Sequence, residues 1–269
     1  MSVLRPGFSE RVFEFSFNAE YANRNRAILA GAPSIPTQNK EKSLGYDVKF
    51  EIAAHGGAVH AVALQHKVSR LVDRLGPSNW AFWNTAGGPY FAFRLDTDQY
   101  NLIESIASAG LPGVEFHFCA PLFATRVAMN GHYLAGTVEA HSVWIDVAGA
   151  GRIADGDMHT IVYRADGSQA FRFSEAPKKL AIVKDEARRV QWESRRNRKI
   201  ESPEHIYSTA LQLLRNYWPE RRSKMQRRSD MEGGTLPNKL PDEAEPTLAN
   251  AGRLLADYFG LSLLVEVRQ

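Results

Sequence analysis

A stretch near residue 50 limits the fold most, because it holds two strand-like runs separated by glycines. Apolar and charged side chains alternate through residues 46–52, which read YDVKFEI. This period of two is expected of a half-buried strand. Gly56 and Gly57 mark a reversal, and residues 59–68 form a second run that is small and apolar as far as Gln65. The pattern therefore predicts a β-hairpin.

The rest of the first 180 residues predicts short helices and strands in alternation. We expect helices over residues 13–29, 68–75, 99–109 and 129–134, and strands over residues 90–95, 114–119, 142–147, 159–164 and 169–173. The order strand, helix, strand over residues 90–119 predicts a parallel pair joined by a crossover. The last two strands should form a hairpin around Asp166 and Gly167. We therefore expect a mixed α/β (α+β) fold.

The chain changes character after Pro177, where arginine-rich helical sequence begins. Ser202 is a candidate N-cap, with Pro203 at the first helical position and residues 205–218 as the helix body. Residues 231–246 combine Gly, Pro and acidic residues without periodicity, which is typical of a linker. A final short helix is expected over residues 248–259. We divide the chain into a domain of residues 1–180 and a basic helical region of residues 181–269.

Positive charge is concentrated in the second part. Residues 188–228 hold twelve Lys or Arg against four Glu, so they carry +8 and leave the rest of the chain, whose total is +3, at −5. A basic segment on a mildly acidic body favours contact with a polyanion, although a solvated helical surface gives the same pattern. The arginines expected to contact phosphates are Arg188, Arg189, Arg195, Arg196, Arg198, Arg221 and Arg222.

The composition predicts a cytoplasmic protein. With a single cysteine, Cys119, the chain cannot form an internal disulfide, which fits a reducing compartment. The opening sequence MSVLRPGFSE lacks the apolar run of a signal peptide. No stretch reaches the roughly 18 apolar residues of a spanning helix, so we expect no membrane association.

The hairpin also carries the best candidate for chemistry. Asp47 lies in the first strand, and Gln65 and Lys67 lie at the end of the second. Since Gln65 and Lys67 are two residues apart, both side chains leave the same face of a strand. If Asp47 lies across from them, an acid, an amide and an amine converge. Burying such a group is costly unless it has a partner or a function.

This arrangement resembles the PD-(D/E)XK nuclease superfamily, in the Mrr-like variant with Gln-x-Lys in place of an acid and lysine. The resemblance covers roughly residues 10–120, as a helix, hairpin, helix and strand, and Gly45-Tyr46 stands where the family often has a proline before Asp47. It implies a restriction-endonuclease-like mixed sheet flanked by helices, here with added strands and the arginine-rich region. It further implies a metal-dependent endonuclease that hydrolyses DNA in bacterial restriction or anti-phage defence.

The resemblance also implies the ligands of a Mg²⁺ (or Mn²⁺) ion, a hard cation that prefers oxygen. Asp47 is the principal ligand, Gln65 offers its side-chain carbonyl and His66 its backbone carbonyl. Glu20 matches the glutamate that these nucleases carry on the preceding helix. Lys67 then orients the attacking water or stabilises charge on the phosphate.

The nuclease interpretation makes one demand on geometry. A strict two-residue turn at Gly56-Gly57 sets Asp47 opposite His66, whereas the site requires Asp47 opposite Gln65 or Lys67. The hairpin must therefore contain a three-residue loop or a bulge.

Several alternatives stay open. Asp47 and Lys67 can form a cross-strand ion pair on a solvated face. The chain can be a catalytically inactive nuclease-fold module that binds nucleic acid or a partner protein of a defence system, and a homo-oligomer is compatible with either function. Cys119 can be the nucleophile of a cysteine hydrolase with a nearby histidine, although a buried thiol is the common explanation. The aromatic residues between positions 80 and 93 fit a core better than a base-stacking surface.

Overall fold

The structure is a computed structural model that describes residues 3–37, 44–53, 59–111, 113–174, 176–183 and 206–215. Its helices are α1 (Glu10–Arg24), α3 (Trp80–Ala86), α4 (Thr97–Ser108) and α5 (Arg126–Ala135), with a 3-10 turn η2 (Pro77–Asn79). Residues 206–215 are also helical. The strands are β1 (Val3–Leu4), β2 (Val48–Ala53), β3 (Val59–His66), β4 (Arg70–Val72), β5 (Tyr90–Arg94), β6 (Val114–Pro121), β7 (Ser142–Asp146), β8 (Thr160–Arg164), β9 (Ala170–Phe173) and β10 (Pro177–Ile182).

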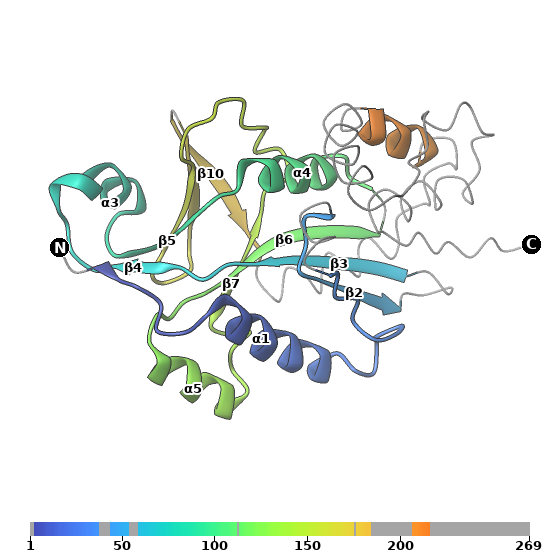
Figure 1. Cartoon of the computed structure of the whole chain (residues 1–269), viewed down its shortest axis with the longest axis horizontal. Coiled ribbons are helices and arrows are strands. Elements are labelled where there is room, and N and C mark those ends of the chain that lie inside the picture. Colours follow the sequence, from blue (N-terminus) through green and yellow to red (C-terminus); the bar gives the residue numbers. More distant parts are fainter. Residues whose placement is uncertain are drawn as a thin grey trace, which may run out of the picture.

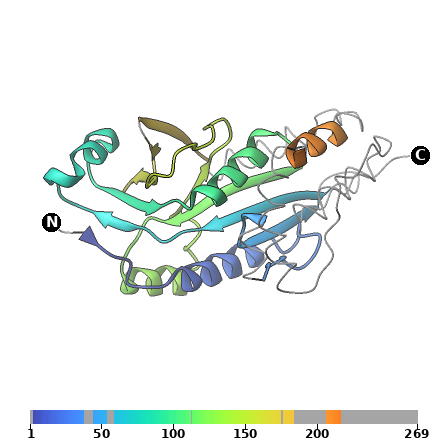
Figure 2. The same cartoon turned by 45° about the horizontal axis from the view of Figure 1, so that its top comes forward.

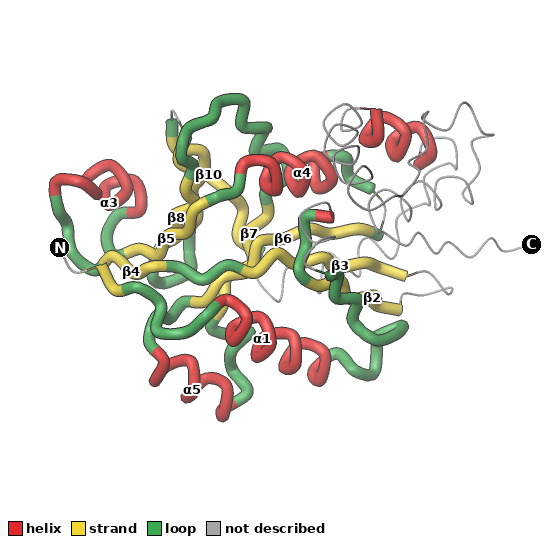
Figure 3. Tube along the Cα trace, in the orientation of Figure 1, coloured by secondary structure: helices red, strands yellow, loops and turns green. Residues whose placement is uncertain are grey.

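These strands form a single curled sheet in the order β1-β4-β5-β8-β9-β10-β7-β6-β3-β2. Every neighbouring pair is antiparallel except β3 and β6, which run parallel. Figure 3 shows the strands as a continuous band with helices outside it. The expected mixed α/β (α+β) class is confirmed.

Helices cover both faces of the part of the sheet that contains β2, β3 and β6. Figures 1 and 2 show α1 and α5 on one face and α4 on the other. The first face buries Val48, Val62 and Leu64 against aromatic residues of α1. On the second face, buried side chains of α4 and of residues 206–215 join one apolar cluster. The hairpin is therefore enclosed between two cores.

The start of each covering helix is fixed by a local hydrogen bond. The Ser9 hydroxyl accepts from the Val12 N–H at 3.3 Å, and an Asp96 carboxylate oxygen accepts from the Gln99 N–H at 3.0 Å. Such side chains satisfy N–H groups that have no partner within the helix. Because Ser9 caps the helix, α1 begins at Glu10, three residues before the predicted helix of residues 13–29. It ends at Arg24, five residues before the predicted end.

Most of the expected elements are confirmed with small changes of boundary. The hairpin of β2 and β3, the strand β5, the helices α4 and α5, and the strands β6 to β9 all form. Gly167 adopts a φ of +68° at the reversal between β8 and β9. Residues 206–215 agree with the predicted helix of residues 205–218.

Three expectations are wrong. The predicted helix of residues 68–75 is instead the short strand β4, which pairs with β1 and β5. β5 and β6 are not a parallel pair, because β5 pairs with β4 and β8 while the parallel neighbour of β6 is β3. Helical sequence does not begin after Pro177, since β10 continues the sheet to Ile182.

Some predictions lie outside the described residues. These are the N-cap at Ser202, the linker of residues 231–246, the helix of residues 248–259, and the arginines at positions 188, 189, 195, 196, 198, 221 and 222. Within the described part of the chain, no helix combines the length and the apolar character needed to cross a membrane.

Candidate functional site

The hairpin register places Asp47 next to Gln65. Val48 pairs with Leu64 and Ala53 pairs with Val59, so Asp47 stands opposite Gln65 at the open end of the ladder. The Asp47 N–H donates to the Leu64 carbonyl at 2.8 Å, which continues the pairing by one residue. This is one of the two registers that the nuclease interpretation requires. It is not the register that a strict two-residue turn would set.

Asp47 is buried and accepts three hydrogen bonds. The Gln65 Nε2 donates to Asp47 Oδ1 and Oδ2, both at 2.9 Å, and the His66 backbone N–H donates to Oδ2 at 2.6 Å. Only 7% of Asp47 is exposed, so it does not belong to a solvated sheet face. Burial raises the pKa of Asp47, but hydrogen bonding and charge from His66, with the charge of Lys67, outweigh burial and lower this pKa below its usual value. Asp47 is therefore held as a carboxylate.

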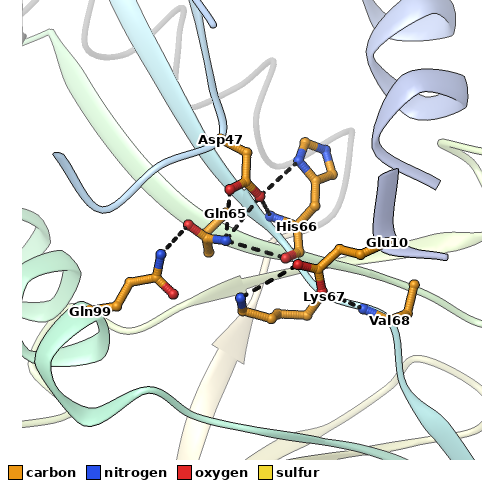
Figure 4. Close-up of polar contacts among 7 residues, drawn as sticks. All are labelled: Glu10, Asp47, Gln65, His66, Lys67, Val68 and Gln99. Carbon is orange, nitrogen blue, oxygen red and sulfur yellow. Dashed lines mark hydrogen bonds and ion pairs between the residues drawn. The ribbon is translucent and has the colours of Figure 1, made fainter. Parts of the chain in front are cut away.

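Lys67 forms its ion pair with α1 and not with Asp47, although its positive charge acts on that carboxylate. Its Nζ is 3.8 Å from Glu10 Oε1, and Glu10 Oε2 accepts from the Val68 N–H at 3.3 Å. Figure 4 shows Lys67 and Glu10 on the side of Gln65 away from Asp47. The expected alternative of an Asp47–Lys67 ion pair is replaced by this contact. The lysine side chain is 18% exposed and can reach a group arriving from solvent.

The His66 ring lies beside Asp47, on the side that faces α1. Its Nδ1 is 3.6 Å from Asp47 Oδ2, and it meets the rings of Phe13 and Phe17 edge-on at centroid distances of 5.7 and 5.3 Å. His66 is fully buried. The ring nitrogen therefore lies close to the same carboxylate oxygen to which the His66 backbone N–H donates.

Glu14, like Glu10, is an acid of α1 whose charge acts on this site, and sequence reasoning missed it. Burial raises the pKa of Glu14 above its usual value, and the nearby negative charge of Asp47 raises it further. Two carboxylates whose charges repel one another are both stabilised in the ionised form by a nearby positive charge. The four-residue spacing of Glu10 and Glu14, which puts both on one face of a helix, was the signal that could have identified them.

The structure does not bring Glu20 to Asp47. Its two carboxylate oxygens accept from the backbone N–H groups of Val138 and Glu139, at 2.7 and 3.3 Å. Glu20 lies six residues after Glu14, which is about 9 Å further along a helix axis. Glu20 therefore binds the connection between α5 and β7 through these hydrogen bonds.

A second missed residue, Gln99, contacts the site from the first turn of α4. Its Nε2 donates to Gln65 Oε1 at 2.7 Å (Figure 4). No local sequence signal joins Gln99 to a residue 34 positions away. Gln65 is fully buried, and both ends of its amide are occupied, one by Asp47 and the other by Gln99.

The residues present suit a hard divalent cation. Asp47 supplies a carboxylate, Gln65 an amide and His66 a backbone carbonyl, each of which contains an oxygen that can bind such a cation, and Glu14 is a carboxylate of α1 whose charge acts on Asp47. Among the described residues, no group of three His, Cys, Asp or Glu side chains converges as a metal site. Any cation bound here would therefore use amide and backbone oxygens as well as carboxylates.

The cysteine alternative depends on Cys119 and a nearby histidine. Cys119 is fully buried in the core beneath α1. His117, two residues away, has its Nε2 3.3 Å from Glu115 Oε2. Of the aromatic residues at positions 80–93, Phe82 and Trp83 pack on the core around Tyr90, as expected, while Trp80 is 62% exposed.

Comparison with protein-family models, curated proteins and solved structures found no match.

Proposed function

We propose that this chain is a metal-dependent phosphodiesterase that hydrolyses DNA, with Asp47 as the principal ligand of Mg²⁺ or Mn²⁺. The observation that carries the proposal is the convergence of Asp47, Gln65 and the backbone of His66 at the end of β3, with Lys67 alongside. The topology also supports it. The helix α1, the hairpin, the helix α4 and the strand β6 follow the helix, hairpin, helix and strand order that the PD-(D/E)XK resemblance implies.

In this proposal Glu14 takes the part that the resemblance gave to Glu20. It lies on the preceding helix, as that part requires, and its charge acts on Asp47. When bound, the metal supplies Lewis acidity and lowers the pKa of a water molecule. The chain's own residues do the rest: Asp47 stays ionised, and Lys67 contributes positive charge to the phosphate as negative charge grows on it.

The test is cleavage of plasmid DNA with Mg²⁺ or Mn²⁺, comparing the wild type with Asp47→Asn and Lys67→Met. We expect both variants to lose roughly a hundredfold or more in rate, because each removes a charge that acts on the reacting group. Asp73→Asn, which changes an exposed carboxylate, is the matched control and should cleave at the wild-type rate. Equal rates for Asp47→Asn and wild type, or no cleavage with any divalent ion, contradict the proposal.

One observation favours a second candidate, an inactive nuclease-fold module that binds nucleic acid or a partner protein. The three hydrogen bonds accepted by Asp47 satisfy its carboxylate without a metal. If this candidate is correct, Asp47→Asn changes neither DNA binding nor metal content, and no variant changes cleavage.

A further inference from the structure

The hydrogen bonds through Gln65 have a direction that the charge of Asp47 dictates. An ionised carboxylate can only accept, so Gln65 must turn its NH₂ group toward Asp47. Its carbonyl oxygen then faces α4 and can only accept. Gln99 must therefore offer its own NH₂ group, as it does at 2.7 Å. The chain of donors runs from Gln99 to Gln65 to Asp47.

A cation on this site requires the opposite direction. To serve as a ligand, Gln65 must present its carbonyl oxygen on the Asp47 side, which places its NH₂ group toward α4. Gln99 must then accept and present its own carbonyl oxygen. Because Gln65 is fully buried, its far end has no water to satisfy it and depends on Gln99.

We infer that Gln99 is a positioning residue that sets whether Gln65 faces Asp47 as a donor or as a metal ligand. The inference rests on the proposed metal site. An amide at position 99 serves both states, since turning it by half a rotation exchanges donor for acceptor. A side chain that can only accept, or only donate, at position 99 fixes Gln65 in one state.

Gln99 suits this role because its backbone is fixed in the first turn of α4 while its side chain is only half-buried. Its N–H is held by the Asp96 N-cap at 3.0 Å in the first turn of α4. Glutamate is well accepted in a first helical turn, where it interacts favourably with the helix dipole. Gln99→Glu should therefore fold, which makes it a usable test.

The experiment measures Mn²⁺ affinity by titration calorimetry in Gln99→Glu and Gln99→Lys. The acceptor-only glutamate should bind Mn²⁺ at least about tenfold more tightly than the donor-only lysine. Thr97→Glu and Thr97→Lys place the same charges in the same turn and measure the charge effect alone. If the Mn²⁺ affinities of the two Gln99 variants differ by no more than those of the two Thr97 variants, Gln99 acts only through its charge and the inference is overturned.

A second measurement needs no metal and separates this inference from the proposed function. In EDTA, Gln99→Glu should unfold at lower urea than Thr97→Glu, because Gln65 then turns its oxygen toward the Asp47 carboxylate. Asp47→Asn offers both a donor and an acceptor, so it should erase this difference. Loss of the difference in the Asp47→Asn background supports the inference even if the wild type cleaves no DNA. Persistence of the difference there overturns it.

Discussion

At the scale of single residues, two of the three acids of α1 lie in different environments. Glu14 is half-buried and feels the negative charge of Asp47, whereas Glu20 binds backbone N–H groups at the far end of the helix. We expect Glu14→Gln to weaken Mn²⁺ binding roughly ten- to a hundredfold. Without metal it should raise the stability at pH 7, since a raised folded-state pKa means that ionisation of Glu14 opposes folding.

Glu20→Gln is the matched comparison. It should leave Mn²⁺ affinity unchanged and lower the free energy of unfolding, because its amide offers one oxygen to two backbone donors. Titration calorimetry and urea unfolding measure the two effects. A larger loss of affinity in Glu20→Gln than in Glu14→Gln contradicts the assignment.

Glu115 carries a prediction about pH. Its two oxygens lie 3.3 Å from His60 Nε2 and His117 Nε2. Burial raises the pKa of Glu115, but hydrogen bonds and charge from the two histidines outweigh burial and lower it well below its usual value. A lowered carboxyl pKa stabilises the fold above the unfolded-state value of about 4.3, and this contribution is lost as the pH falls toward the folded-state value.

Glu115→Gln should therefore cost roughly 1 to 3 kcal/mol at pH 6, where the wild-type carboxylate is ionised. Urea unfolding at pH 6 and pH 3.5 tests this, with a smaller cost expected at the lower pH. A cost that is the same at both pH values means that ionisation of Glu115 contributes nothing to stability.

At the scale of elements, Gly45 lies where the segment before β2 packs against α4. It has a φ of +82°, which side chains with a Cβ rarely adopt, and an added Cβ would lie 3.2 Å from atoms of Leu102 and Ile103. Gly45→Ala should cost roughly 1 to 3 kcal/mol and reduce cleavage, because it displaces the segment that holds Asp47. Gly31→Ala meets no atom within 4 Å and is the control. Equal stability of the two variants in urea contradicts this account.

The sequence predicted those elements whose signals are local. Alternation gave the hairpin, and the Asp47–Gln65–Lys67 grouping followed from it. β4 escaped prediction because its three residues are too short for a period to appear. The parallel partner of β6 also escaped, since pairing with β3 brings together residues about 50 positions apart. For the same reason the hydrogen bond between Gln99 and Gln65 could not be read from spacing.

At the scale of the whole molecule, the site exists only when distant parts of the chain are assembled. Glu14 comes from α1, Asp47 precedes β2, and Gln65 and His66 end β3 beside the parallel strand β6. These groups are separated in the unfolded chain, which therefore binds a cation poorly. A cation that binds the folded state alone shifts the folding equilibrium toward it.

The final prediction follows from this linkage. At a Mn²⁺ concentration about a hundredfold above its dissociation constant, binding adds about 2.7 kcal/mol of stability. For a chain of this size we expect a rise in Tm of roughly 5 to 10 °C. Thermal unfolding in MnCl₂ and in EDTA measures it, with NaCl of equal ionic strength as the control for screening. Asp47→Asn should show no rise beyond the NaCl control, because the principal ligand is gone. If wild type and Asp47→Asn rise equally, Mn²⁺ stabilises the chain from some other place, and the metal site at Asp47 is wrong.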